Sequence, residues 1–293
     1  MSAHDVLVAG ATGRQGGAVA RRLLEKGHRV RAFTRSPQSP RALQLEGMGA
    51  VIVKGDFDDR ESLDKALAGT TAAFLVATPY ESGSIAETRQ ALAFVDSARS
   101  SGTAHLVYSS VASADKRTGI PHFESKHQVE RHIESSGIPH TILAPSAFVD
   151  DFIDEPDSRA ELSRGWLAMP LSPTRELQQV SIAEVAELAA LAIEQRDRFL
   201  GLRIEVASHS IAAQRMAQVL SQATGHDIAY REVPLDDARG QMGDEVADMF
   251  AWFERAGFDV DIEKLRNAYP EVQWQTFEEW AGAQDWSRLE PGA

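Results

Sequence analysis

The chain has 293 residues, of which 43% are apolar and 25% are charged, as in an ordinary globular protein. It contains no cysteine, which excludes disulfides, thiolate metal sites and cysteine nucleophiles. The net charge of −13 comes from residues 150–293, which carry 28 acidic and 13 basic side chains, whereas residues 1–149 carry 15 and 17. An anionic cofactor is therefore favoured in the first half, and direct nucleic-acid binding is disfavoured.

The N-terminal residues lead directly into an apolar strand, without a basic leader or a long apolar segment. We therefore expect no secretory signal. No apolar run approaches the roughly 20 residues that span a bilayer. The expected location is the cytoplasm, without membrane contact.

Short apolar runs alternate with amphipathic stretches through the first 145 residues. Buried strands separated by helices are typical of a parallel sheet that is covered on both faces. Residues 1–150 are therefore predicted to form an α/β domain with a Rossmann-type, doubly wound parallel sheet. The predicted strands are 6–10, 29–35, 50–56, 71–79, 105–110 and 140–145, and the predicted helices are 16–27, 58–69, 84–102 and the segment that begins at Pro121.

The pattern changes after residue 150, where helical periodicity dominates. We expect residues 151–293 to form a smaller, mostly helical C-terminal α/β lobe that closes over the ligand edge of the first domain. Thr276 and Glu279 have the spacing of a capping box at the start of the last helix. The other predicted helices lie within 178–195, 210–225 and 244–257, and the predicted strands are 203–207 and 227–234.

The segment GATGRQGG, residues 10–17, gives the strongest local signal. Gly10, Gly13 and Gly16 lie between an apolar strand and an amphipathic helix. Glycine is required where the backbone turns sharply, approaches a pyrophosphate and packs a helix on a strand. The N-terminus of the helix then offers N–H groups and a positive dipole end to the phosphates. The segment therefore predicts a dinucleotide site.

The end of the second strand bears on the choice between NAD and NADP. An acidic side chain there favours the free 2′-hydroxyl of NAD. This strand instead ends in AFTRSP, with Arg35 and no carboxylate. Because arginine binds a 2′-phosphate through charge-assisted bonds, we predict that NADP(H) is preferred over NAD(H). Arg14 in the glycine loop is a second candidate contact, with a solvated surface arginine as the equal alternative.

Two further strand ends are expected to line the cofactor. Asp56, in GDFDD, follows the third strand, where its carboxylate could accept a hydrogen bond from the adenine amine. Asp58 and Asp59 are interpreted instead as the cap and first turn of the next helix. The fourth strand ends in VATP, and the residues expected beside the nicotinamide ribose are Ala77, Thr78 and Pro79. The threonine could alternatively do no more than end the strand.

Together these motifs resemble the NmrA-like family of atypical short-chain dehydrogenase/reductase relatives. The similar segments are GATGRQGGAVARRLL, AFTRSP, GDFDD, HFESKHQVE and SGIPHTILAPSAFVDDF, and the resemblance continues to the end of the chain. It is closest to NADPH-sensing redox regulators, and more distant to quinone reductases and isoflavone-type reductases. It implies a Rossmann-type domain with NADP(H) at the glycine loop. The implied cofactor contacts are Gly10, Ala11, Thr12, Gly13, Arg14, Gln15, Gly16, Arg35, Asp56, Phe57, Ala77, Thr78, Pro79, Lys126 and Phe148.

Ordinary short-chain dehydrogenases transfer hydride with a Ser–Tyr–Lys relay, in which the tyrosine moves the proton. In this chain Ser109, His122 and Lys126 have the spacing of that relay, with histidine in place of tyrosine. Residues four apart share a helix face, so both side chains of the pair could point into the crevice. Three interpretations are open. Lys126 only holds the nicotinamide ribose, Lys126 donates the proton as in isoflavone-type reductases, or His122 acts as the general acid.

Two functions follow as hypotheses. The missing tyrosine favours an NADPH redox sensor that responds to cofactor occupancy and acts through a regulatory protein partner. The alternative is an NADPH-dependent reductase of a quinone, an enone or a similar small electrophile. The nine histidines show no metal-ligand spacing, so no metal is expected.

Overall fold

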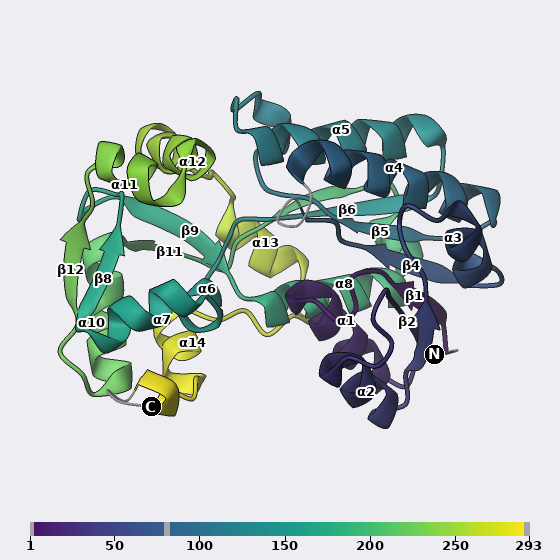
Figure 1. The fold of residues 1–293 in the computed structure, drawn as a ribbon, viewed down its shortest axis with the longest axis horizontal. Helices are drawn as coiled ribbons and strands as arrows, with labels where there is room; N and C mark the ends of the chain where they lie inside the picture. Colours follow the sequence, from purple (N-terminus) through teal and green to yellow (C-terminus); the bar gives the residue numbers. More distant parts are fainter. Residues whose placement is uncertain (1–2, 79–82, 290–293) are drawn as a thin grey trace. The chain divides into compact units, whose positions relative to one another are not determined.

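The computed structural model describes residues 3–78 and 83–289. The chain divides into two compact units, whose elements are labelled in Figure 1. Unit 1 comprises Met1–Pro145 and Ile182–Glu205, and unit 2 comprises Ser146–Ser181 and Val206–Ala293. No helix within the described ranges is long and apolar enough to cross a membrane.

Unit 1 is built on a seven-stranded sheet with the order β10-β6-β5-β4-β1-β2-β3. The five strand pairs from β6 to β3 are parallel, which confirms the predicted Rossmann-type sheet. The strand order reverses between β1 and β4, the position where doubly wound sheets bind ligands. The strands are β1 (Asp5–Val8), β2 (Arg29–Thr34), β3 (Val51–Lys54), β4 (Ala72–Leu75), β5 (Leu106–Ser109), β6 (His140–Pro145) and β10 (Arg203–Val206).

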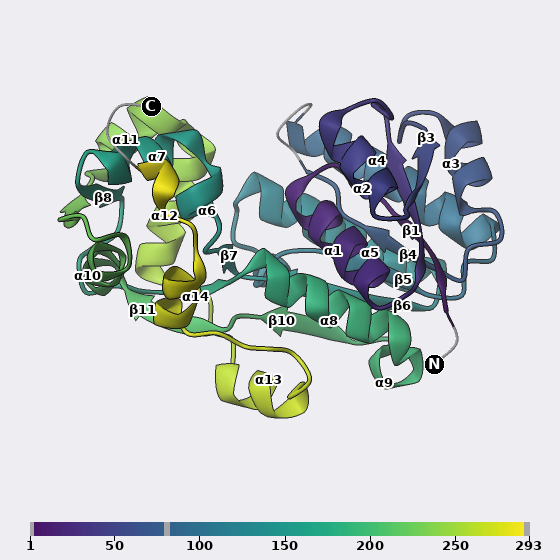
Figure 2. The ribbon, with the colours of Figure 1, turned by 90° about the horizontal axis from the view of Figure 1, so that it is seen from below.

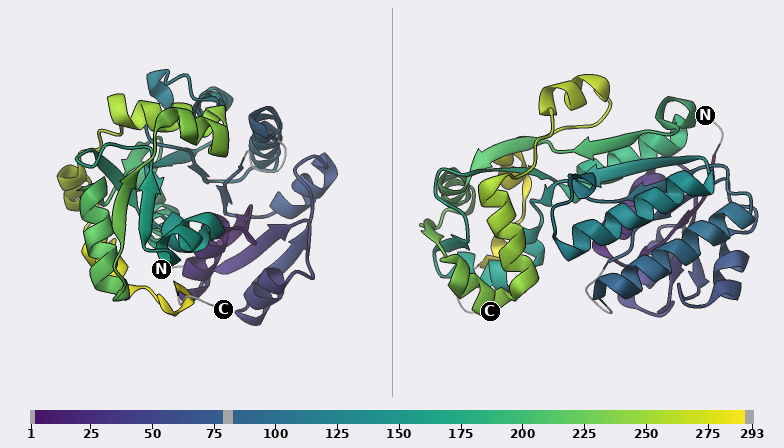
Figure 3. Two further views of the ribbon diagram at one scale, coloured as in Figure 1. Left: turned by 60° about the vertical axis from the view of Figure 1, so that its left-hand side comes forward. Right: turned by 90° about the horizontal axis from the view of Figure 1, so that it is seen from above.

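Helices cover both faces of this sheet, as Figures 2 and 3 show. On one face α1 packs against α8, and on the other α4 packs between α3 and α5. Strands covered on both faces need apolar side chains throughout, which explains the continuous apolar runs. The helices are α1 (Arg14–Glu25), α2 (Pro40–Gly47), α3 (Arg60–Leu67), α4 (Gly83–Ser100), α5 (Pro121–Ser136), α8 (Ile182–Glu194) and α9 (Arg196–Phe199), with a 3₁₀ turn η1 (Ala114–Lys116).

Local signals set several helix ends of unit 1. The Asp59 side chain accepts hydrogen bonds from the N–H groups of Glu61 and Ser62 and caps α3, one residue later than the sequence predicted. Helix α1 is followed by Gly27 at a φ of +81°, and α5 by Gly137 at +74°. Both values lie in the left-handed region that glycine occupies at helix ends.

The segment Ile182–Glu205 differs from the sequence prediction, which assigned everything after residue 150 to the C-terminal lobe. In the structure α8 packs on α1, and β10 extends the sheet beside β6. Ten of the 13 residues of α8 are buried, so this helix needs cover over most of its circumference. Arg22 of α1 pairs with Glu187 of α8 at 3.1 Å, which joins the two helices at their surface. Periodicity predicts such a helix but not its neighbour.

Unit 2 contains a three-stranded sheet in the order β11-β9-β7 and a two-stranded sheet of β12 and β8. The strands are β7 (Ala147–Phe148), β8 (Trp166–Met169), β9 (Glu176–Val180), β11 (His209–Ala212) and β12 (Ala229–Glu232). The helices are α6 (Asp151–Asp154), α7 (Pro156–Ser163), α10 (Ala213–Thr224), α11 (Leu235–Met242), α12 (Asp244–Arg255), α13 (Ile262–Ala268), α14 (Phe277–Ala283) and the 3₁₀ turn η2 (Ser287–Leu289).

The predicted capping box of unit 2 is confirmed. The Thr276 side chain accepts from the Glu279 N–H, and the Glu279 side chain accepts from the Thr276 N–H. One predicted boundary is wrong, because the helix expected from residue 210 begins only at Ala213. Residues 209–212 instead form β11, which pairs antiparallel with β9. The pairing with a distant strand overrides the local helical pattern.

Candidate functional site

The loop between β1 and α1 has a backbone that requires glycine. Gly10 has a φ of +63°, in the left-handed region, and its carbonyl oxygen accepts the Gly13 N–H at 2.8 Å. A Cβ atom on Gly16 would lie 2.3 Å from the Gly10 carbonyl oxygen. No side chain fits there, so α1 packs directly on the loop. The predicted strand–loop–helix arrangement is confirmed, and its geometry is that of a loop that approaches a pyrophosphate.

The N-terminus of α1 carries no competing negative group. Its cap residue, Gly13, has no side chain that could accept a hydrogen bond from the helix, and the first turn holds no acidic residue. The first N–H groups of a helix have no acceptor within the helix. They and the positive end of the helix dipole therefore form an environment suited to a phosphate. Among the predicted contacts of this loop, Ala11 is buried, whereas Thr12, Arg14 and Gln15 are half-buried.

Two arginines follow β2. Arg35 is exposed directly after the strand, as predicted. Arg41, which was not predicted, lies in the first turn of α2 and donates from Nη1 to the Thr12 carbonyl oxygen at 3.1 Å. The Thr12 and Thr34 hydroxyls lie 3.5 Å apart, so the glycine loop, the end of β2 and the start of α2 meet at one point. The sequence signal was Ser-Pro-Arg at residues 39–41, a helix start that turns a basic residue back toward the loop.

Asp56 and Phe57 follow β3. The Asp56 Oδ1 atom accepts the Asp58 N–H at 3.0 Å, so this carboxylate closes the turn into α3. The Phe57 ring packs between Phe33 and Phe94, at centroid distances of 5.8 and 5.9 Å. Phe57 therefore contributes to the core beside the strand end. Hydrogen bonding from Gln90 lowers the pKa of Asp58, and Arg89 and Arg35 add to this effect.

Lys126 lies on α5 and is held by two partners. Its Nζ donates to the Ala77 carbonyl oxygen at 2.5 Å and pairs with Glu87 Oε1 at 2.7 Å. Glu87, on α4, also accepts from Ser125 Oγ at 3.0 Å. Its side chain is only 1% exposed, and that of Lys126 is 11% exposed. Sequence analysis identified Lys126 but missed Glu87, which looks like one more acid on an amphipathic helix.

The other residues of the expected relay also contact neighbouring side chains within the protein. Ser109 is fully buried, and its hydroxyl donates to Gln15 Oε1 at 2.6 Å, which ties β5 to the glycine loop. The half-buried His122 ring stacks edge-on against Phe123 at 4.9 Å. Tyr108 does not replace the missing tyrosine, because its ring is fully buried. Burial, with Glu87 and Glu130 nearby, raises the pKa of the Tyr108 hydroxyl well above its ordinary value.

A charged network fixes the segment between β5 and α5. Arg203 Nε donates to both carboxylate oxygens of Glu130 at 3.1 Å, and Arg203 Nη1 donates to Glu205 Oε1 at 3.1 Å. Glu205 also accepts the backbone N–H of Ser113 at 2.7 Å. Ser113 and Arg117 have positive φ values of 61° and 50°, and no other described non-glycine residue does. The network therefore holds a strained backbone directly before the helix that carries Lys126.

The remaining predicted contacts lie in three places. Ala77 is buried and Thr78 exposed after β4, beside Lys126. Pro79 lies outside the described residues. Phe148 is half-buried in β7 and belongs to unit 2, whereas the other predicted contacts belong to unit 1.

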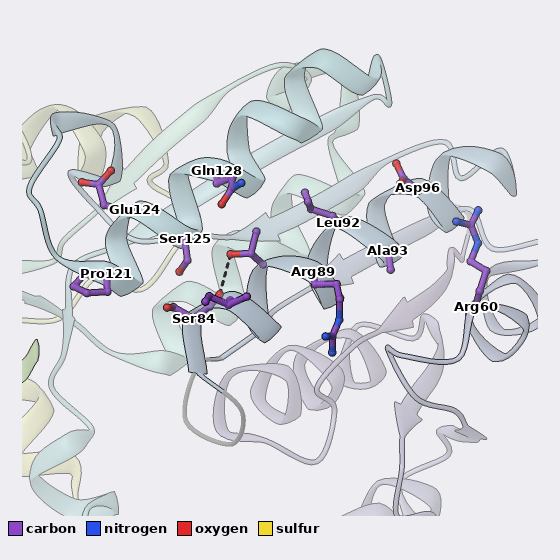
Figure 4. A pocket seen from close by; sticks show the side chains of 12 residues that line it. Arg60, Ser84, Arg89, Leu92, Ala93, Asp96, Pro121, Glu124, Ser125 and Gln128 are labelled. Carbon is purple, nitrogen blue, oxygen red and sulfur yellow. Dashed lines mark hydrogen bonds between the residues drawn. The ribbon is translucent and has the colours of Figure 1, made fainter.

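A groove of about 710 Å³ lies between α4 and α5 on the outside of unit 1. Figure 4 shows Leu92 of α4 on the side of Ser125 and Gln128 of α5, whereas Arg89 points away from α5. None of the predicted cofactor contacts lines this groove. It reaches the Glu87–Lys126 pair only through Ser125.

Similar proteins include enzymes and a regulator. A (4-alkanoyl-5-oxo-2,5-dihydrofuran-3-yl)methyl phosphate reductase from Streptomyces griseus is 30% identical over 239 residues, which cover 80% of this chain and 79% of that protein. The structure of Citrobacter sp. triphenylmethane reductase complexed with NADP(H) has a TM-score of 0.81 at 21% identity, covering 96% of this chain and all of that one. Nmra, a negative transcriptional regulator in complex with NAD, has a TM-score of 0.77 at 18% identity, covering 98% and 99%.

The two structural likenesses agree with the doubly wound sheet of unit 1. The family model described as NmrA-like matches residues 2–281, nearly the whole length. The chain belongs to the NmrA-like family.

Proposed function

We propose that this protein binds NADP(H) across the carboxyl ends of β1, β2 and β4. The observation that carries this proposal is the loop geometry, in which Gly16 leaves no room for a side chain and α1 begins without a capping carboxylate. The backbone can therefore approach a pyrophosphate closely. The nicotinamide cofactors in the triphenylmethane reductase and Nmra structures support the same assignment.

The basic residues after β2 favour NADP(H) over NAD(H). No carboxylate follows this strand directly, and Arg35 and Arg41 flank the point where Thr12 meets Thr34. Two guanidinium groups suit the doubly charged 2′-phosphate, which a free 2′-hydroxyl would not require. At the other end of the cofactor, we assign Lys126 to the nicotinamide ribose.

We propose that the protein uses this site as an NADPH sensor. Ser109 donates to Gln15, Lys126 is paired with Glu87, and histidine stands in the tyrosine's place, so a Ser–Tyr–Lys relay is missing. Cofactor binding would couple α5 to the β4 end, because Lys126 bonds to Ala77. A sensor needs only this coupling between occupancy and conformation.

A second candidate is an NADPH-dependent reductase, which the reductase names of the similar proteins favour. Bound NADPH supplies a hydride. A cationic acceptor takes that hydride and becomes neutral without a proton, so a missing tyrosine costs nothing with such a substrate. A quinone or an enone needs a proton as well, for which Lys126 and His122 are the candidates.

Binding and turnover measured on the same protein separate these proposals. NADPH affinity is measured by calorimetry, and NADPH oxidation is followed with cationic triphenylmethane dyes, quinones and enones. Tight binding without turnover across the panel supports the sensor. Turnover that is lost in His122→Gln identifies a proton donor and contradicts the sensor. Absence of NADPH binding at millimolar concentrations overturns the cofactor assignment itself.

The lysine needs a matched variant in this experiment. Lys126→Met alone leaves the buried Glu87 carboxylate without its cation, which is expected to destabilise unit 1. The neutral pair Lys126→Met with Glu87→Gln avoids that buried charge. A loss of turnover in this double variant, with its unfolding midpoint preserved, then reports on the reaction rather than on folding.

A further inference from the structure

We propose that Glu87 is the positioning residue of Lys126: its carboxylate holds the ammonium group at the end of β4, where Lys126 donates a hydrogen bond to the cofactor. This inference rests on the proposed NADP(H) site. It assigns a role to a residue on α4 that lies outside the glycine loop, the strand ends and the Ser–Tyr–Lys spacing.

The burial of Glu87 requires a compensating partner. Glu87 lies one helical turn before Ala91, on the side of α4 that packs on the sheet with Phe94 and Val95. An ionised carboxylate in such surroundings is costly unless it is paired and hydrogen-bonded. Ser125 donates a hydrogen bond to its Oε2 atom, and Lys126 forms an ion pair with its Oε1 atom. A buried ion pair is seldom more stabilising than an apolar pair of the same volume, so stability alone does not account for this one.

The geometry explains the ion pair as a way of holding the Lys126 ammonium group in a fixed position. An ammonium group has three N–H donors. Within the described part of the chain, one of them donates to the Ala77 carbonyl oxygen, and Nζ forms an ion pair with Glu87 Oε1 at 2.7 Å. The Tyr108 ring lies 5.8 Å from Nζ and adds a favourable cation–π contact.

The Ala77 carbonyl follows β4, next to the switch point between β1 and β4. Ligands of doubly wound sheets bind at such a point. Held there by Ala77 and Glu87, the ammonium group can donate to a ribose hydroxyl of the cofactor.

The test compares Glu87→Gln and Glu87→Asp with a surface control. Glutamine keeps the size of the side chain but removes its charge, whereas aspartate keeps the charge on a shorter side chain. The control is Glu61→Gln, because Glu61 forms an exposed pair with Lys65 on α3. Thermal unfolding of each variant verifies that the fold is retained.

The first readout needs no cofactor. Lysine side chains are acylated with acetic anhydride, and the labelling rates of Lys126 and Lys65 are measured by mass spectrometry of the peptides. We expect Lys126 to react at least tenfold more slowly than Lys65 in the unmodified protein. Glu87→Gln should accelerate Lys126 several-fold without changing Lys65, and Glu87→Asp should restore part of the protection. An unchanged Lys126 rate in Glu87→Gln overturns the proposal.

The second readout is NADPH affinity. We expect Glu87→Gln to raise the Kd for NADPH about tenfold, the equivalent of one charge-assisted hydrogen bond, with partial recovery in Glu87→Asp and no change in Glu61→Gln. If Glu87→Gln accelerates the labelling of Lys126 but leaves the Kd for NADPH unchanged, the proposed role of Glu87 in cofactor binding is contradicted. If the unmodified protein fails to bind NADPH, the proposed function is wrong, and the labelling rates still decide whether Glu87 positions Lys126.

Discussion

At the scale of single residues, the proposed preference for NADP(H) rests on the charges of Arg35 and Arg41. Each follows β2, and Arg41 is anchored to the Thr12 carbonyl oxygen of the glycine loop. We expect Arg35→Glu to weaken NADPH binding at least tenfold and NADH binding much less, because only NADPH carries the 2′-phosphate. Calorimetric titration with both cofactors measures the difference.

Arg41 provides the comparison for this prediction. Arg41→Gln should lower the NADPH affinity by a smaller factor than charge reversal at Arg35, since glutamine can still donate to the Thr12 carbonyl oxygen. Equal losses of NADPH and NADH affinity in both variants would contradict the assignment of the 2′-phosphate to this position.

Ser113 combines two unfavourable features. It has a φ of 61°, and its buried hydroxyl has no hydrogen-bond partner within the described structure. The contact with Glu205 uses only the Ser113 backbone N–H. Ser113→Gly therefore keeps that bond, relieves the left-handed backbone and removes the unsatisfied hydroxyl. We expect a gain of about 1 kcal/mol in the free energy of unfolding, measured with urea. Ser113→Ala, which keeps the backbone strain, should gain less; a larger gain from alanine would refute the strain argument.

His105 is expected to make stability depend on pH. It is buried and donates to Thr141 Oγ1 at 2.8 Å, because that hydroxyl itself donates to the Phe199 carbonyl oxygen. Burial, with Arg196 nearby, lowers the pKa of His105 to about 4. Below the ordinary value of about 6.5 the unfolded chain binds a proton that the folded chain does not, so stability falls between these two pH values and the loss is complete near pH 4.

The size of this effect is roughly 3 kcal/mol, from a difference of about 2.5 pKa units. His105→Gln should remove the part of the stability loss at low pH that His105 causes. Urea unfolding at pH 7 and pH 4.5 measures this difference. The half-exposed His132, which pairs with Asp96, offers the control His132→Gln. An identical pH dependence in His105→Gln and the unmodified protein would show that His105 is not the titrating group.

At the scale of elements, the predictions succeeded where burial follows a local pattern. Strands β4 and β5 of unit 1 are buried along their whole length, and α3 lies within the segment 58–69 that the sequence predicted as a helix. Strand β9 was missed because its sequence, ELQQV, is polar. The Gln178 amide exchanges hydrogen bonds with the backbone of Val260, and Gln179 is buried. A polar strand of this kind depends on partners 82 residues away, which no local pattern reveals.

The candidate site likewise contains residues that a local pattern predicts and residues that only tertiary contacts identify. The glycine loop could be predicted because one short segment supplies the turn, the close approach and the helix start. Lys126 was found through its spacing from Ser109, but Glu87 is defined only by a contact that joins α4 to α5. Arg41 likewise becomes relevant only once α2 folds back on the loop. Spacing along the chain thus predicts local motifs, and tertiary contacts decide their partners.

The segment between β5 and α5 depends on one cation. Arg203 binds Glu130, whose side chain is 2% exposed and which also accepts from Ser110 Oγ at 2.5 Å. Arg203→Met should lower the free energy of unfolding by roughly 3–5 kcal/mol, because the carboxylate stays buried without its cation. Adding Glu130→Gln to this variant should recover part of the loss in urea unfolding. Additive losses in the double variant would contradict the coupling of the two residues.

At the scale of the whole molecule, the chain forms unit 1 from two separate stretches. It leaves the sheet after Pro145, builds part of unit 2 and returns at Ile182. The returning segment supplies α8, which covers α1, and β10, which pairs with β6. A doubly wound sheet whose helix layer comes partly from a later segment cannot be cut at residue 150 without exposing the apolar side of α1.

This dependence predicts how fragments behave. Residues 1–150 alone should lack cooperative thermal unfolding, since α1 loses its contact with α8 and β6 loses its pairing with β10. A chain that joins residues 1–145 to 182–205 through about ten Gly/Ser residues restores α8 and β10, and it should unfold cooperatively. Circular dichroism melting and the dispersion of amide NMR signals distinguish the two. If residues 1–150 melt as sharply as the joined chain, α8 and β10 are dispensable, and the single boundary near residue 150 describes the folding unit better than the discontinuous unit does.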